Sequence, residues 1–129
     1  MAIIGIDHVV IRVKDIEEAI ASYRALGLEL TNQTENPAVG KVAIFALADG
    51  FFLELVAPLS PESPIGKAIE SRGEGVHSIA LAVDNLEESV AELKSREAPV
   101  IRGEGLPVAF IHPKATHGAM LQIMERRAS

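Results

Sequence analysis

The chain contains two stretches, 70 residues apart, in which hydrophobic and polar residues follow the same order. Residues 5–21 and residues 75–91 each begin with a run of mainly apolar residues and then change to apolar residues at helical spacing. In the first stretch, residues 9–13 are typical of a buried strand, and Ile16 and Ile20 share one face of a helix. The pattern therefore predicts a strand followed by a helix, twice.

Polar residues mark the start of each predicted helix. Asp15 in the first stretch, and Asp84 or Asn85 in the second, can accept a hydrogen bond from a free backbone N–H of the first turn. Glutamate pairs follow at residues 17–18 and 87–88, where the helix dipole favours negative charge. These caps support the same order of strand and helix in both copies.

A pair of further strands is predicted after each helix, because apolar and β-branched residues are flanked there by turn-forming residues. Asp49 and Gly50 separate the strands of the first pair, and residues 113–118 separate those of the second. Two matching hairpins indicate an internal duplication. The four strands are predicted at residues 41–48, 51–56, 107–112 and 119–125.

A proline-rich linker, residues 58–74, joins the two halves. Ser63 can cap a short helix over residues 65–72, and Pro64 suits its first position. Because a half of this length buries too little apolar surface alone, the halves are expected to form a single domain over residues 1–129. Its two repeats extend over residues 5–57 and 75–125.

Composition narrows the classes of function. The net charge of −6 opposes binding to nucleic acid or to an anionic membrane, so neither partner is expected. The absence of cysteine excludes disulfides, thiolate metal ligands and thiol nucleophiles. No stretch approaches the ~18 apolar residues of a membrane helix, and a soluble, cytoplasmic protein is expected.

Four segments resemble, in order along the chain, the signature segments of methylmalonyl-CoA epimerases. That family belongs to the vicinal oxygen chelate superfamily of glyoxalases, bleomycin resistance proteins and dioxygenases. The resemblance implies an α+β glyoxalase-like fold, in which paired βαβββ modules form a partial barrel around a cavity. The segments are IDHVV at residues 6–10, ELVAPLSPESPI at 54–65, RGEGVH at 72–77 and FIHPK at 110–114.

The resemblance also implies an activity. Such an enzyme is a metal-assisted epimerase or isomerase of a small acyl thioester, which removes an α-proton and stabilises the resulting enolate. The expected ligands are a divalent metal, which could be Co, Mn, Ni or Zn, and a small-molecule substrate such as an acyl-CoA. A homodimer is compatible with the family.

The family pattern can be carried over to individual residues. His8, Glu54 and Gln122 fall on metal-ligand positions, and Glu54 and Gln122 are the expected catalytic residues. Lys114, beside His112 in the last signature segment, is the expected contact of a CoA phosphate or a substrate carboxylate.

The second half departs from the pattern at two positions. The offset of 70 places Ser78 where the family has a histidine, and matching residues 54–56 with residues 122–124 places Gln122 where it has a glutamate. A serine hydroxyl is a poor ligand for a transition metal, and an amide cannot accept a proton at neutral pH. Either Glu54 takes over the role of base, or the activity differs from that of the family. His77 points to the opposite face of its strand and is interpreted as structural.

Two alternatives to the epimerase follow. The loss of two expected ligands is compatible with a metal-free protein of the same fold that binds a small molecule. A glyoxalase-type lyase is the other alternative, although no segment favours glutathione adducts over CoA thioesters.

Overall fold

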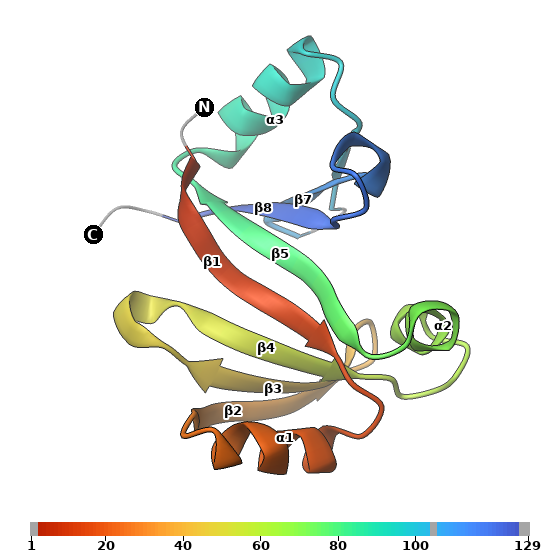
Figure 1. Ribbon diagram of the computed structural model, residues 1–129. Helices are drawn as coiled ribbons and strands as arrows, with labels where there is room; N and C mark the ends of the chain where they lie inside the picture. The colour runs from red at the N-terminus through yellow and green to blue at the C-terminus, as the bar shows by residue number, and fades with distance from the viewer. Residues whose placement is uncertain (1–2, 104–105, 127–129) are drawn as a thin grey trace. The chain divides into compact units, whose positions relative to one another are not determined.

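The computed structural model describes residues 3–103 and 106–126. Its elements follow the order βαβββ twice, with one helix between the copies, which confirms the predicted α+β architecture (Figure 1). None of the helices in these two ranges is both long enough and apolar enough to cross a membrane. In chain order the elements are β1 (Ile3–Arg12), α1 (Ile16–Ala25), β2 (Glu29–Asn36), β3 (Gly40–Ala46), η1 (Ala48–Gly50), β4 (Phe52–Ala57), α2 (Pro64–Arg72), β5 (Gly75–Val83), α3 (Leu86–Ser95), β6 (Val100–Arg102), β7 (Val108–Ile111), η2 (Pro113–Ala115) and β8 (Leu121–Glu125).

The chain divides into two units, and the division runs through β1 and β5. The first unit consists of residues 8–77. The second unit contains the described residues of 1–7 and 78–129. The strands form one eight-stranded sheet, to which each unit contributes four strands and a helix packed on them.

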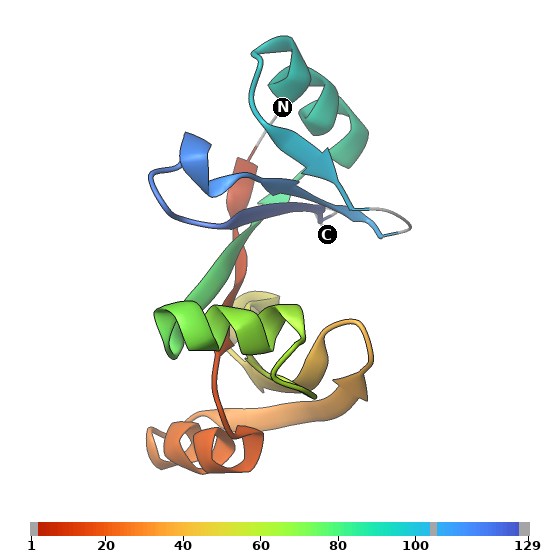
Figure 2. The same cartoon turned by 90° about the vertical axis from the view of Figure 1, so that its right-hand side faces the viewer.

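The part of the sheet that belongs to the first unit has the strand order β2-β3-β4-β1. β1 pairs with β4 in parallel, and the other pairs are antiparallel. One face of the sheet packs against α1, where Ile16 and Ile20 contact Phe45 and Leu55. The opposite face packs against α2, where Ile65 joins a smaller cluster. Figure 2 shows α1 and α2 on opposite sides of these strands.

Strand alternation explains why one sheet can bury both faces. Val10 and Val56 belong to the cluster under α2, whereas Leu55 and Ala57 belong to the cluster under α1. Residues 55–57 of β4 are therefore apolar on both faces, which is typical of a strand covered on two sides.

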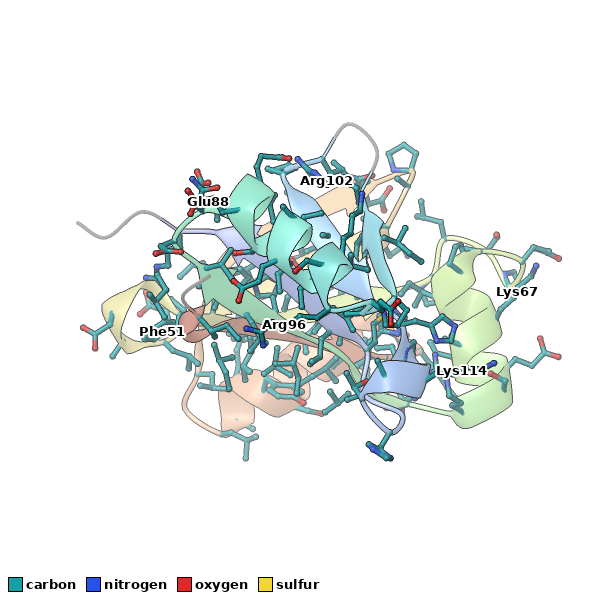
Figure 3. All side chains as sticks on the ribbon, turned by 90° about the horizontal axis from the view of Figure 1, so that it is seen from above. Phe51, Lys67, Glu88, Arg96, Arg102 and Lys114 are labelled. Carbon is teal, nitrogen blue, oxygen red and sulfur yellow. The ribbon has the colours of Figure 1, made fainter. Side chains whose placement is uncertain are left out.

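The second unit repeats this design with the strand order β5-β8-β7-β6. β5 pairs with β8 in parallel, and α3 covers one face through Leu86 and Val90, which pack on Ala109 and Ile123. Arg102 on β6 lies beside α3 (Figure 3) and forms an ion pair of 3.0 Å with the exposed Glu87. The eight-stranded sheet has β2 and β6 as its edge strands and is not closed into a barrel.

The predicted helix caps are present. The side chain of Asp15 accepts a hydrogen bond from the backbone N–H of Glu18 at 3.0 Å, and Asn85 does the same for Glu88 at 2.9 Å. Of the two candidates at the second helix, Asn85 is therefore the cap. Ser63 caps α2 as predicted.

The turn at Asp49 shortens one predicted strand. Asp49 has a left-handed backbone with φ of 62° inside the short helix η1. β3 therefore ends at Ala46, two residues before the predicted end. A strand cannot continue through a left-handed residue, because its φ lies outside the β region.

Arg12, at the end of β1, joins this strand to the segment that follows α2. Its side chain is buried, with Nε donating to the carbonyl of Gly73 and Nη1 donating to the carbonyl of Val76, both at 2.8 Å. Next to it, the backbone N–H of Lys14 donates to the Glu74 carboxylate at 2.8 Å. These bonds fix the path of the chain from α2 into β5 within the first unit.

Candidate functional site

His8 and Glu54 project from the same face of the first unit's sheet. In the parallel pairing of β1 with β4, His8 lies opposite Phe52 and Val10 lies opposite Glu54. Side chains two residues apart share a face, so His8, Phe52 and Glu54 gather on the face opposite α1. The His8 ring stacks on the Phe52 ring, with centroids 4.3 Å apart and planes 10° apart, and His8 is 8% exposed.

The environment of Glu54 changes its acidity. Burial removes water from the carboxylate and raises the pKa of Glu54 above its usual range. The nearby His8 favours the charged form and opposes part of this rise in the pKa. A carboxylate with a raised pKa is a stronger proton acceptor than a solvated one, which is the property that a general base requires.

Ser78 and Gln122 form the corresponding pair in the second unit. In the parallel pairing of β5 with β8, Gln122 lies opposite Ala80, as Glu54 lies opposite Val10 in the first unit. Nε2 of Gln122 donates a hydrogen bond of 2.8 Å to Oγ of Ser78, which is 2% exposed. The predicted equivalence of these positions thus holds at the level of strand register.

The predicted metal ligands can be tested by their chemistry. Two of them, His8 and Glu54, lie together in the first unit, and Gln122 lies in the second. Among the residues that the structure describes, no group of three histidine, cysteine, aspartate or glutamate side chains is arranged to hold a metal. The amide of Gln122 is engaged with a serine hydroxyl, and neither of these groups is a strong ligand for a transition metal.

These donors therefore do not fit a transition-metal centre, for which catalytic sites ordinarily supply three imidazole, carboxylate or thiolate ligands. The ligand roles of His8, Glu54 and Gln122 stay a prediction.

Lys114 lies in the short helix η2, where Figure 3 labels it. Its backbone N–H donates to Nδ1 of His112 at 3.1 Å, so the imidazole caps η2. Because Nδ1 accepts this bond, the neutral ring carries its proton on Nε2. The Lys114 side chain is exposed, and its predicted contact with a CoA phosphate or carboxylate stays a prediction.

His77 has a different environment from that of His8. Its Nδ1 atom is buried and has no hydrogen-bond partner among the residues that the structure describes. Burial lowers the pKa of His77, and the positive charges of Arg12 and Arg72 lower this pKa further. The lowered pKa favours the neutral form of this partly buried ring, and the interpretation of His77 as a structural residue stays a prediction.

Phe52 and Arg12 were not predicted from the sequence to have these contacts. The ring of Phe52, which belongs to an apolar run in the sequence, stacks on His8. Arg12 was not singled out, although a charged residue inside an apolar strand is a recognisable signal, since a buried charge needs partners.

The fold and the comparison with known protein families indicate the same class of protein. Paired βαβββ units with a polar pair on the corresponding strands of each unit define a glyoxalase-like protein. Residues 7–111 match the family model of the Glyoxalase/Bleomycin resistance protein/Dioxygenase superfamily. The chain belongs to this superfamily.

Within the superfamily, the chain is similar to methylmalonyl-CoA epimerases. It is 34% identical to the ethylmalonyl-CoA/methylmalonyl-CoA epimerase of Cereibacter sphaeroides, over 92% of this chain and 95% of that protein. It is 32% identical to the mitochondrial methylmalonyl-CoA epimerase of Homo sapiens, over 92% of this chain and 72% of that protein. A solved methylmalonyl-CoA epimerase in complex with methylmalonyl-CoA and NH4+ has a TM-score of 0.84 and 27% identity, covering 98% of this chain and 97% of that one.

Proposed function

We propose that this protein binds a small acyl thioester of the methylmalonyl-CoA type and transfers the proton on the carbon next to the thioester carbonyl. The observation that carries the proposal is the position of Glu54, a largely buried carboxyl beside His8 on one sheet face. The similarity to epimerases of methylmalonyl-CoA and ethylmalonyl-CoA supports the class of ligand.

In the proposed reaction, the Glu54 carboxylate removes the α-proton. The electron pair of the broken C–H bond moves toward the thioester carbonyl oxygen and forms an enolate. The protonated Glu54 then returns a proton to the same carbon, or exchanges it with water first. His8 favours the charged carboxylate before the transfer, and the stack on Phe52 fixes the orientation of the imidazole.

Deuterium exchange tests this reaction directly. Methylmalonyl-CoA is incubated with the protein in deuterium oxide, and incorporation at the α-carbon is followed by proton NMR against a protein-free sample. We expect exchange by the natural protein and a loss of about 10²–10⁴-fold in Glu54→Gln, since the amide cannot accept the proton. Glu62→Gln, which changes an exposed glutamate of the same unit, is the control and should exchange normally.

The reaction is measured both with EDTA and with added Co²⁺ or Mn²⁺. An absence of exchange in both conditions would contradict the proposal. Equal rates in the natural protein and in Glu54→Gln would leave the class of reaction in place and remove Glu54 as the base.

A second candidate function is binding without turnover. The observation in its favour is the amide at Gln122, since an amide has no basic group for proton transfer. Saturable binding of methylmalonyl-CoA with no α-exchange in either condition would favour this function over the enzyme.

A further inference from the structure

We propose that Ser78, held in place by Gln122, donates a hydrogen bond to an oxygen of the bound acyl thioester. This pair would then act at the positions where the resemblance expects a histidine and a glutamate as metal ligands. The proposal rests on the proposed function, because it concerns the same class of ligand. It assigns to this neutral pair a hydrogen-bonding role in place of metal ligation.

The hydrogen bond between Gln122 and Ser78 has a defined direction. A serine hydroxyl has one proton to donate and two lone pairs that accept. Nε2 of Gln122 occupies one lone pair of Ser78 Oγ at 2.8 Å, and an amide N–H group can only donate. The hydroxyl proton is therefore directed away from the nitrogen of Gln122.

The proton of the Ser78 hydroxyl needs an acceptor other than the nitrogen of Gln122. Among residues 3–103 and 106–126, the bond from Gln122 is the only hydrogen bond found for the Ser78 hydroxyl. Ser78 is 2% exposed, and a buried donor without an acceptor is unfavourable. An oxygen of a ligand would satisfy this donor. Gln122 is only partly buried, so the pair borders the accessible surface.

The surroundings of Ser78 along β5 are apolar. Ala80 and Ala82 lie on the same face of β5 as Ser78 and are fully buried, so apolar side chains surround the pair along its own strand. In such surroundings water competes weakly, and a hydrogen bond to a developing negative charge is stronger than in solution. A donor that is already polarised by Gln122 suits the carbonyl oxygen of a thioester.

The carbonyl itself reports on this contact. A hydrogen bond to a thioester carbonyl withdraws electron density from its carbon and moves the carbon signal downfield. Propionyl-CoA labelled with ¹³C at the carbonyl is bound to the full-length protein in the presence of EDTA. The carbonyl signal is then recorded by ¹³C NMR, and the affinity is measured by calorimetry.

Three variants separate the roles. Ser78→Ala removes the donor. Gln122→Glu keeps the size of the side chain, but its carboxylate can only accept and draws the Ser78 proton to itself. Ser89→Ala is the matched control, because Ser89 is also a fully buried serine of the second unit and donates to the carbonyl of Asn85 in its own helix turn. Thermal unfolding by circular dichroism verifies that each variant is folded.

We expect a downfield carbonyl signal in the natural protein without metal. Ser78→Ala and Gln122→Glu should lose this shift and bind about three- to tenfold more weakly, as expected for one hydrogen bond. Ser89→Ala should keep both the shift and the affinity. If Ser78→Ala fails to fold, the isosteric Gln122→Glu gives the same test.

Two results would overturn the role of Ser78 alone. One is an unshifted carbonyl in the bound state, and the other is a shift that persists in Ser78→Ala or appears only after Co²⁺ is added. A natural protein that gives neither heat nor any change in the ¹³C signal would overturn the proposed function together with this inference.

Discussion

The carboxyl of Glu54 lies close enough to the imidazole of His8 for the two groups to interact electrostatically, although they are contributed by different strands. The parallel register of β1 and β4 brings them together, since Glu54 pairs with Val10, two residues after His8. Both side chains are largely enclosed, so the charge of Glu54 is exposed to little water. This environment makes the ionisation of Glu54 a measurable property of the folded protein.

Glu54→Gln is expected to change how stability depends on pH. Burial raises the pKa of Glu54 in the folded state, so the folded protein holds this proton at a pH where the unfolded chain has lost it. Stability therefore falls as pH rises from the unfolded pKa through the folded pKa. The amide has no charge to bury, and Glu54→Gln should be more stable than the natural protein above this window.

Urea unfolding between about pH 4 and pH 8 measures this effect. The gain in the free energy of unfolding of Glu54→Gln should grow with pH across this range. Glu62→Gln, at an exposed position, controls for the general loss of one negative charge. A gain from Glu54→Gln that is the same at both ends of the range would show that burial of the charge is not its cause.

Arg12 is expected to be a major contributor to the stability of the first unit. Arg12→Met keeps most of the aliphatic volume but removes the donors to Gly73 and Val76, and it should lower the free energy of unfolding by about 2–4 kcal/mol. Arg12→Lys keeps the charge without the planar fork and should lose less. Equal losses in the two variants would show that the positive charge alone contributes no stability and that only the geometry of the guanidinium group matters. Chemical denaturation of both proteins gives the comparison.

Two glycines with left-handed backbones should respond differently to alanine. Gly40 has φ of 125°, and an added Cβ would meet the backbone carbonyl of Ala57 on the neighbouring strand. Gly27 has φ of 91°, and an added Cβ would meet no heavy atom within 4 Å. Gly27→Ala therefore measures the backbone cost alone, about 1 kcal/mol, whereas Gly40→Ala should lose about 2 kcal/mol or more. Similar losses in thermal unfolding would show that the strand moves to accommodate the new methyl group.

The helices and the paired strands could be predicted because each buries one regular stripe of side chains. α1 and α3 have a capping side chain and an apolar face, and both features are present in the sequence. The strands β2 and β6 were not located. Nearly every side chain of Glu29–Asn36 is exposed, so the strand has no alternation, and Val100–Arg102 is too short to show a period.

The two polar pairs were predictable to different degrees. His8 and Glu54 follow the family pattern, and strand register places them on one face as that pattern implies. Ser78 and Gln122 depart from the pattern, and from the sequence this departure indicates only the loss of two ligands. That the two replacements bond each other depends on the register of β5 with β8, which one sequence does not specify.

The same register predicts how a metal ligand pair could be introduced into the second unit. Ser78→His together with Gln122→Glu would place an imidazole and a carboxylate in the positions that correspond to His8 and Glu54. Both groups are good ligands for Co²⁺, whereas a hydroxyl and an amide are not. The double variant should therefore bind Co²⁺ more tightly than the natural protein, with Gln122→Glu alone in between.

Calorimetric titration with Co²⁺, together with the visible absorption of the bound ion, measures this order. Circular dichroism shows whether the larger imidazole is accommodated at a position that is 2% exposed in the natural protein. Natural protein that binds Co²⁺ as tightly as the double variant would contradict the argument, because the Ser78–Gln122 pair would then not limit metal binding. That result would instead favour the predicted ligand set of His8, Glu54 and Gln122, with the Gln122 carbonyl oxygen on the metal.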